Sequence, residues 1–306
     1  MMSAIRGKIS FPRVLSFDAF ETLYLLLEPP FKTYHKFGLK YGIAKSPDAI
    51  SKDFIVGFKE MELRFPNYGI NNDLLIEEFN EFKVVDESNP VIRYSDNWWG
   101  LLISKAFHPY KVPFNMSKDL IEYFSGEAYY TDSCLVNTIK KMKMVDLSKF
   151  DEGAEVKVKN DRPILLINSN GDPRVKLILK HLQLVSDEMI AEDLVYISYN
   201  TQVEKPNKES FEYIINDLVK RGLLTFNNEA ELLKYCWHFG DTYCTDLQGS
   251  INSGWNGILI DRNYGYDYFL EAKEQNFAKM EGGYLWDGDK KFIINDYKQL
   301  DSIFDT

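Results

Sequence analysis

Four short segments of this chain carry side chains suited to moving a phosphoryl or similar group onto a carboxylate. They are Asp18 with Thr22 four residues later, Ser169-Asn170, Lys205-Pro206, and Gly240-Asp241 followed by Asp246. A carboxylate nucleophile attacks an electrophile that is held in line with it. An anionic phosphoryl group also needs cations and hydrogen-bond donors around it. The residue types therefore predict attack by an aspartate on a phosphorus or carbon centre.

Each segment supplies one part of such a site. Oxygen ligands for a hard cation come from three aspartates: Asp18, Asp241 and Asp246. Lys205 would offset the crowding of their negative charge. The hydroxyl groups of Thr22 and Ser169 would donate hydrogen bonds to phosphate oxygens. Together the segments predict a cation-assisted site in which one carboxylate is the nucleophile.

Apolar runs of strand length end just before several of these polar residues. The runs are Val14–Phe17, Ile164–Ile167, Leu194–Ile197, Tyr235–Phe239 and Gly257–Ile260. Helical spacing of apolar residues falls between them, at 174–184 and 210–218. Alternating strands and helices predict an α/β fold, with a Rossmann-like parallel sheet flanked by helices. Ligands of such sheets bind beyond the carboxyl ends of the strands, where the polar residues would lie.

The stretch from residue 28 to residue 155 has a different character. It is rich in aromatic residues and mostly helical in pattern, with Pro29-Pro30 at its start and Asp151–Glu155 as its exit linker. We therefore expect a core made of residues 1–27 and 156–306, interrupted by an inserted, mainly helical domain of residues 28–155.

Composition narrows the classes of partner. The 306 residues carry a formal net charge of -10, which disfavours binding to a phosphate backbone. No apolar run approaches the roughly 20 residues of a membrane helix. We therefore expect a small-molecule substrate, no nucleic acid and no membrane. The three cysteines form no CxxC pair, and a cytoplasmic location is expected. The basic residues within 1–13 leave a mitochondrial presequence as the alternative.

The ordered set of four segments resembles the haloacid dehalogenase superfamily of hydrolases. The order, the position of each segment at a strand end and the spacing all agree. The resemblance covers residues 11–27 and 156–305. The insertion after the first segment stands where the family places a helical cap domain of the first class. Each segment alone would be weak evidence, because short patterns of this kind occur by chance.

The resemblance implies a role for each residue. Asp18 would be the nucleophile and, with the backbone carbonyl of Phe20, a ligand of Mg²⁺. Ser169 would bind the transferring group, and Lys205 would stabilise the nucleophile and the intermediate. The remaining roles concern four further positions: Asp241 as a metal ligand, Asp246 as a ligand directly or through water, and Thr22 and Asn170 as orienting groups. Asn170 would also face the substrate, a small phosphorylated metabolite.

One position departs from the pattern of the family's phosphatases. They carry a second aspartate two residues after the nucleophile, which protonates the leaving group and then activates water, but Phe20 stands there. Loss of a general acid–base typically costs about 10²–10⁴-fold in rate. Three functions stay open: a magnesium-dependent phosphohydrolase, a catalytically impaired relative that binds a ligand or protein, and a 2-haloacid dehalogenase. Glu21, where many relatives have glycine, is interpreted as a solvated charge.

A narrower resemblance joins the cap to the core. Four segments are similar to the subgroup typified by haloacid dehalogenase-like hydrolase domain-containing protein 3: Asn97-Trp98-Trp99, Ser169–Asp172, Glu204-Lys205-Pro206 and His238–Gly249. Trp98 and Trp99 are expected to pack within the cap or against the core. His238, inside a strand pattern, is expected to be structural.

Overall fold

The computed structural model describes residues 9–70, 72, 90–150, 155–262, 278–279, 284–287 and 291–304. Of residues 90–94 it describes the backbone alone. Residues 1–8 of the predicted presequence and residues 151–154 of the predicted exit linker lie outside this range.

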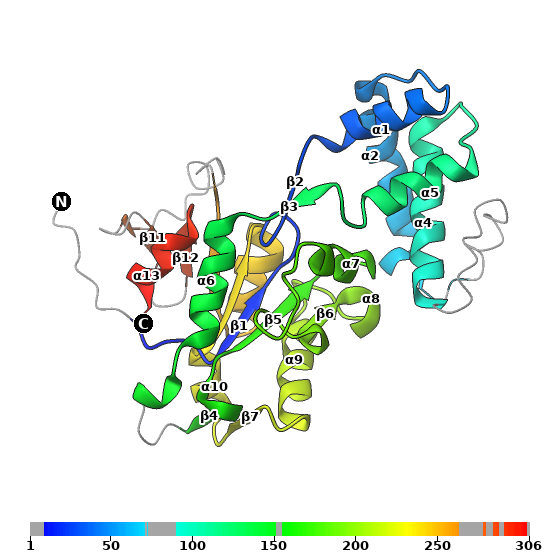
Figure 1. Ribbon diagram of the computed structural model, residues 1–306. Helices are drawn as coiled ribbons and strands as arrows, with labels where there is room; N and C mark the ends of the chain where they lie inside the picture. The colour runs from blue at the N-terminus through cyan, green and yellow to red at the C-terminus, as the bar shows by residue number, and fades with distance from the viewer. Residues whose placement is uncertain are drawn as a thin grey trace.

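The described residues form one large sheet at the centre of the molecule (Figure 1). Its strand order is β10-β11-β12-β9-β8-β1-β5-β6, and the pairs from β12 to β6 are parallel. The strands span Val14–Phe17 (β1), Ile164–Ser169 (β5), Val195–Ile197 (β6), Cys236–Gly240 (β8), Asn256–Ile260 (β9), Ala278–Lys279 (β10), Leu285–Asp287 (β11) and Lys291–Ile294 (β12). The chain leaves β1 toward β5 and β6, and later returns to its other side at β8. This reversal of strand order beside β1 is where parallel α/β sheets bind ligands.

Burial on both faces explains why these strands are continuous apolar runs. Every residue of β1, β5, β8 and β9 is buried. Helices supply the cover, and one hydrophobic cluster joins the sheet to α6 (Ser133–Met144), α7 (Arg174–His181) and α9 (Lys208–Lys220). A parallel sheet with both faces covered needs apolar side chains in both directions. The predicted Rossmann-like fold with an inserted helical segment is therefore confirmed.

A second group of helices lies apart from the sheet in Figure 1. It comprises α1 (Pro30–Lys40), α2 (Pro47–Arg64), the short η1 (Asn67–Gly69), α4 (Pro90–Phe107) and α5 (Phe114–Tyr123). These helices have hydrophobic clusters of their own, rich in aromatic residues. We call them the helical unit. Two connecting segments run side by side between it and the sheet, where β2 (Leu25–Leu26) pairs with β3 (Tyr129–Tyr130).

The segment after β3 packs with the sheet. Leu135, Ile139 and Met142 of α6, and Leu147 of η2 (Leu147–Lys149), belong to the sheet's cluster. The predicted domain boundaries at residues 27/28 and 155/156 stay a prediction. A small antiparallel pair, β4 (Val156–Val158) with β7 (Leu224–Phe226), follows the linker and was not expected from the sequence.

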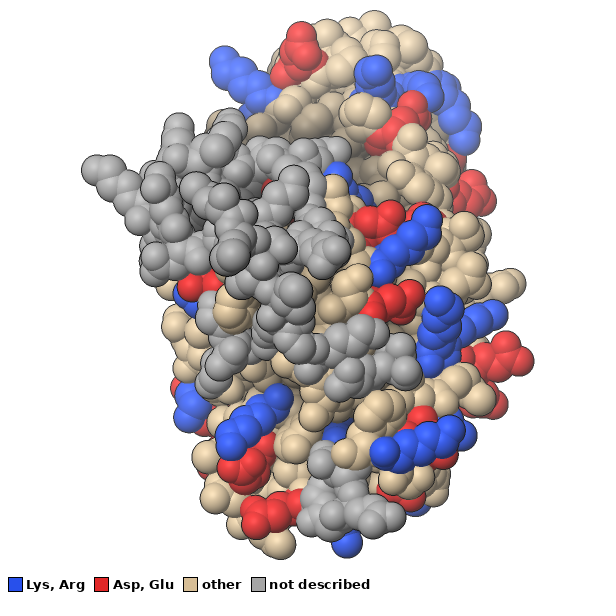
Figure 2. All heavy atoms as spheres, turned by 90° about the vertical axis from the view of Figure 1, so that its left-hand side faces the viewer, with Lys and Arg blue, Asp and Glu red and all other residues tan. Residues whose placement is uncertain are grey.

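The remaining elements are short. They are η3 (Lys159–Asp161), η4 (Glu192–Leu194), α8 (Ser198–Thr201), α10 (Glu229–Lys234), η5 (Tyr243–Gln248), α11 (Gly249–Asn252), η6 (Tyr297–Gln299) and α13 (Leu300–Ile303). Among the described helices, none combines the length and apolar character needed to cross a bilayer. Among the described residues on the face shown in Figure 2, Lys and Arg side chains alternate with Asp and Glu.

Candidate active site

Asp18 lies at the carboxyl end of β1, in the middle of the parallel sheet. Its backbone N–H donates to the carbonyl of Phe239 in the neighbouring β8 at 2.7 Å. This bond extends the ladder between the two strands by one residue, so Asp18 begins where the strand ends. The carboxylate thus lies at the carboxyl end of a central strand, next to the point where the strand order reverses.

Lys205 joins two of the predicted carboxylates. Its Nζ donates to Oδ1 of Asp18 at 2.7 Å and to Oδ1 of Asp246 at 2.6 Å. The Lys205 side chain is 2% exposed. Asn170 holds the backbone of Lys205 from the loop after β5, donating to its carbonyl at 2.7 Å and accepting from its N–H at 2.8 Å. Two reciprocal bonds from one side chain fix the start of the lysine stem, and with it the position of the ammonium group.

Asp241 directly follows β8, and Asp246 lies in the π-helical turn η5 that comes after it. A Cβ at Gly240 would lie 2.1–2.4 Å from the side chain of Asp246, so only glycine leaves room for that carboxylate. The Asp246 carboxylate also accepts from the N–H of Thr242 at 3.0 Å. Thr22 donates to Asp241 at 3.1 Å. The glycine before Asp241 is therefore a condition for bringing Asp246 back to the sheet edge.

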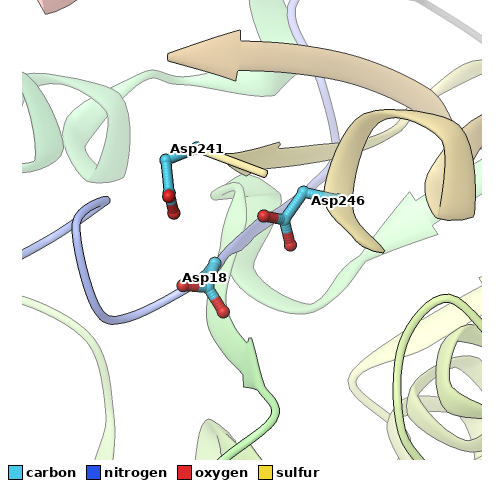
Figure 3. A group of neighbouring side chains, drawn as sticks. All are labelled: Asp18, Asp241 and Asp246. Carbon is cyan, nitrogen blue, oxygen red and sulfur yellow. The ribbon is translucent and has the colours of Figure 1, made fainter. Parts of the chain in front are cut away.

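The three aspartates converge on one point (Figure 3). One ligand oxygen from each of Asp18, Asp241 and Asp246 lies within 4.8 Å of the others. Burial, together with the negative charges of Asp18 and Asp246, raises the pKa of Asp241 to about 7. Burial likewise raises the pKa of Asp18 to about 6, although the Lys205 charge acts in the opposite direction. One ammonium group is too little positive charge for three carboxylates, which is the electrostatic condition of a cation site.

Ser169 ends β5 beside Asp18. It is buried, and its hydroxyl hydrogen bond lowers the pKa of Asp18 against the larger effect of burial. The next residues continue the same loop: the Gly171 N–H donates to the hydroxyl of Ser198 at 3.2 Å. The structure therefore brings together all four segments predicted from the sequence, from Asp18 to Asp246.

The turn after Asp18 explains the unusual Glu21. Glu21 has a φ of 57°, a left-handed conformation that costs a residue with a Cβ more than it costs glycine. Arg262 holds this turn by donating to the carbonyls of Glu21 and Thr22, and Tyr297 donates to the Thr22 carbonyl at 2.8 Å. The glycine that many relatives have at this position would adopt this left-handed conformation without strain. In this protein, the contacts that Arg262 and Tyr297 make with the turn hold Glu21 in that conformation.

Phe20 does not fill the role of an acid–base group. Its ring is 41% exposed and packs against Tyr24 and Tyr129, with centroids 6.0 and 6.3 Å away. Its backbone carbonyl accepts no backbone hydrogen bond from the described residues. The position therefore offers a backbone carbonyl oxygen and an apolar ring, and no side chain that transfers protons.

His238 contacts the candidate site. Its position inside an apolar strand pattern predicted only a structural role. Its Nε2 lies 3.1 Å from Oδ1 of Asp246 and its Nδ1 lies 2.9 Å from the hydroxyl of Ser16. Burial and the Lys205 charge lower the pKa of His238 to about 4, so the ring is neutral at pH 7. Because a carboxylate only accepts, Nε2 carries the proton and Ser16 donates to Nδ1. Burial opposes the ionisation of Asp246, but Lys205 and His238 hold its pKa far below the usual range.

The helical unit contacts the core next to this loop cluster. Nε1 of Trp99 donates to Asp172 at 2.6 Å, and the guanidinium of Arg174 lies over the Trp99 ring, 3.9 Å from its centroid. Asn67 donates to the carbonyl of Ser198 at 3.0 Å. Trp98, by contrast, is buried inside the helical unit and donates to the Phe65 carbonyl. The expectation that the two tryptophans pack within the cap or against the core is confirmed.

Comparisons with known proteins agree with this architecture. No protein-family model matches the chain. The uncharacterized protein YMR130W of Saccharomyces cerevisiae is 28% identical over 268 residues, which cover 87% of this chain and 77% of the yeast protein. The protein named "Putative uncharacterized hydrolase C7D4.05" of Schizosaccharomyces pombe is 27% identical over 262 residues, which cover 85% of this chain and 96% of that protein. The structure titled as the "putative HAD-hydrolase YfnB" of Bacillus subtilis bound to magnesium superposes with a TM-score of 0.51 at 14% identity, covering 97% of this chain and 100% of that one.

The fold is therefore that of the haloacid dehalogenase type of hydrolase. A Rossmann-like parallel sheet carries an acidic cluster at its carboxyl edge, and a group of helices is inserted after the first strand.

Proposed function

We propose that this protein is a magnesium-dependent phosphohydrolase that acts on a small phosphorylated metabolite. The observation that carries the proposal is the cluster of Asp18, Asp241 and Asp246, whose oxygens lie within 4.8 Å of one another. The Lys205 ammonium group is bonded to two of them, Asp18 and Asp246. Such a cluster is suited to bind a divalent cation and then the oxygens of a phosphate ester.

In this proposal each residue acts where the geometry puts it. Asp18 attacks phosphorus, and a P–O bond forms to its carboxylate as the P–O bond to the alcohol of the ester breaks. The alcohol leaves with a proton taken from water. A second water then attacks phosphorus, which releases inorganic phosphate and restores the Asp18 carboxylate. Lys205 holds Asp18 in place and balances charge on the phosphoryl oxygens. Ser169 donates to a phosphoryl oxygen. Thr22 orients Asp241 through its 3.1 Å bond.

Asn170 is best understood as an orienting residue. Both polar groups of its side chain are bonded to the backbone of Lys205. Its predicted contact with the substrate stays a prediction.

The donor set fits Mg²⁺. It consists of carboxylate oxygens and the open Phe20 carbonyl, and hard cations prefer such ligands. Asp18, Asp241 and the Phe20 carbonyl would hold the ion, with Asp246 bound directly or through water. A bound Mg²⁺ would neutralise charge on the transferring phosphoryl group.

Replacing Asp241 by asparagine distinguishes an effect on Mg²⁺ binding from an effect on folding. We expect the metal-free variant to melt above the unmodified protein, because one of three crowded carboxylates is gone. Mg²⁺ at about 100 times its Kd should stabilise the unmodified protein by about 2.7 kcal/mol, or several degrees in Tm, and the variant much less. Thermal denaturation with MgCl₂ or EDTA measures both. Asp187→Asn, at an exposed aspartate outside the cluster, is the control, and an equal Mg²⁺ response in Asp241→Asn would contradict the site.

The direct test of the function is an assay of phosphate release. The protein is incubated with an aryl phosphate and a panel of small phosphate monoesters, in MgCl₂ and in EDTA. Release that needs Mg²⁺ supports the proposal. No turnover across the panel in MgCl₂ would count against it.

A second candidate function rests on Phe20. With a phenyl ring in place of the acid–base group, the chain would be an impaired relative that binds a ligand or a protein through the helical unit. A dehalogenase is disfavoured, because Asp241 and Asp246 place two further carboxylates near Asp18, and metal-independent chemistry at carbon has no use for such a proposed cation site.

Replacing Phe20 by aspartate distinguishes a competent scaffold from an impaired one. If only the acid–base group is missing, kcat should rise by about 10²–10⁴-fold, measured as Mg²⁺-dependent phosphate release. Phe20→Asn is the matched control, since it removes the same ring contacts with Tyr24 and Tyr129 but transfers no proton. If the two variants have the same kcat, the missing proton transfer is not what limits the protein.

We also propose a domain division and a subgroup. The helical unit would be the cap, and it would end before α6, since α6 shares the sheet's hydrophobic cluster. The contact of Trp99 with Asp172 links two of the segments that resemble the subgroup of haloacid dehalogenase-like hydrolase domain-containing protein 3.

A further inference from the structure

The neighbouring strands β1 and β8 carry two rows of residues on the face of the sheet to which Asp18 belongs. Ser16 is in register with His238, and two residues further along each strand Asp18 lies beside Gly240. Because side chains of a strand alternate between its two faces, the row of Ser16 and His238 lies directly below the row of Asp18 and Gly240. Ser16 and His238 are both fully buried. The reaction steps above use neither of them.

Gly240 leaves the space above His238 open for the side chain of Asp246. A Cβ at Gly240 would lie 2.1 Å from Cγ of Asp246, so this carboxylate lies where a side chain of residue 240 would otherwise point. Nε2 of His238 reaches it from below, 3.1 Å from Oδ1. At the other end of the ring, Nδ1 lies 2.9 Å from the hydroxyl of Ser16. The ring also stands edge to face against Phe211, with centroids 5.4 Å apart, so its orientation is fixed on three sides.

The two carboxylate oxygens of Asp246 have different sets of donors. Oδ1 accepts from Nζ of Lys205 at 2.6 Å and from Nε2 of His238 at 3.1 Å. Among the described residues, Oδ2 accepts only from the N–H of Thr242, at 3.0 Å. A carboxylate oxygen offers about two lone-pair sites. The two donors therefore fill Oδ1, whereas Oδ2 keeps one site for a cation or for a water molecule bound to it.

Lys205 alone does not determine which oxygen of Asp246 stays available. Its ammonium group also bonds to Asp18 at 2.7 Å, and it ends a flexible four-carbon stem. Nζ of Lys205 and Nε2 of His238 lie 3.5 Å apart and donate to the same oxygen. The imidazole is rigid, and the hydroxyl of Ser16, by donating to Nδ1, keeps the ring proton on Nε2. The ring therefore fixes the side of the Asp246 carboxylate that faces Lys205.

We propose that His238, oriented by Ser16, is a positioning residue for the cation site: it holds Oδ1 of Asp246 against Lys205 and thereby leaves Oδ2 to bind Mg²⁺, directly or through water. This inference rests on the proposed function, because it concerns the same cation. Groups that hydrogen-bond to metal ligands orient those ligands, and their loss typically costs about 10- to 100-fold in metal affinity. His238 acts through Asp246 and not on the substrate.

Binding of MgCl₂ to two variants of His238 tests this role without any substrate. His238→Leu removes both ring nitrogens, whereas the side-chain amide of His238→Gln supplies an N–H donor in place of Nε2. We expect His238→Leu to raise the Kd for Mg²⁺, measured by calorimetry, about 10- to 100-fold, and His238→Gln to recover most of that loss. Urea denaturation in EDTA measures the free energy of unfolding of each variant. Lower stability of His238→Leu with an unchanged Kd, or an equal rise in Kd in both variants, would show that His238 is structural only.

Ser16 provides a second test that leaves the imidazole in place. Ser16→Ala removes the donor to Nδ1 and should raise the Kd for Mg²⁺ about 2- to 10-fold, the effect of one hydrogen bond. Ser117→Ala, at a buried serine of α5 in the helical unit, is the matched control and should leave the Kd unchanged. In ¹⁵N-labelled unmodified protein, imidazole correlation spectra should place the His238 proton on Nε2. The chain has four histidines, and the loss of one signal in His238→Gln identifies the resonance.

The outcomes separate this role from the proposed function. A ring proton on Nδ1, or the same Mg²⁺ Kd in Ser16→Ala, His238→Leu and the unmodified protein, would overturn the role of His238 and leave the cation site intact. Absence of Mg²⁺ binding by the unmodified protein would overturn the cation site together with this role. Mg²⁺ binding that depends on His238, without phosphate release by the unmodified protein, would support the role and count against the phosphohydrolase.

Discussion

Replacing Asp18 by asparagine is expected to lower Mg²⁺-dependent phosphate release by on the order of 10⁴-fold or more. The amide has nearly the shape of the carboxylate but is not a nucleophile. Lys205 keeps its 2.6 Å bond to Asp246 in this variant, so the ammonium group stays paired. We therefore expect a change in the free energy of unfolding below about 1 kcal/mol, which separates the loss of chemistry from a loss of folding.

Two measurements check this prediction. Steady-state phosphate release gives the rate, and mass spectrometry of acid-quenched protein detects an aspartyl-phosphate at residue 18. The unmodified protein should form the phosphorylated species during turnover, and the variant should not. Phosphate release by Asp18→Asn at the rate of the unmodified protein would show that another group attacks phosphorus.

The second large effect is expected at Lys205, and it concerns stability as well as activity. Lys205→Met would leave Asp18 and Asp246 without their shared cation in a site where Lys205 and Asp246 are each 2% exposed. Removing one partner of a buried ion pair typically costs about 3–5 kcal/mol, because the remaining charge is uncompensated. We expect a loss of this size in metal-free buffer, measured by urea denaturation, together with loss of phosphate release.

A control and a rescue make the Lys205 prediction specific. Lys208→Met removes an exposed lysine three residues away that pairs with Glu212 on the surface, and it should change stability by less than about 0.5 kcal/mol. Adding Asp246→Asn to Lys205→Met should recover part of the loss, since one buried charge is removed. If Lys205→Met and Lys208→Met have the same free energy of unfolding, the Lys205 charge does not stabilise the folded protein as predicted.

Sequence alone determined the apolar strands at the centre of the parallel sheet and the polar residues that end them. Apolar runs such as Val14–Phe17 and Ile164–Ile167 have to be buried on both faces, which defines a covered parallel sheet. The polar residues that end these runs, Asp18 among them, meet at one edge because parallel strands point the same way. Both properties are local to the chain, so spacing and residue type suffice to predict them.

Contacts between distant segments were decided only by the tertiary structure. His238 reaches Asp246 because η5 turns back on β8 over Gly240, which its apolar strand context does not indicate. The pairing β2–β3 involves two residues on each side, too few for a periodic signal. Arg174 is a first-turn residue of α7 by its sequence context. Its burial between Asp172 and Trp99 depends on how the helical unit docks, a packing property that the spacing of residues along the chain does not encode.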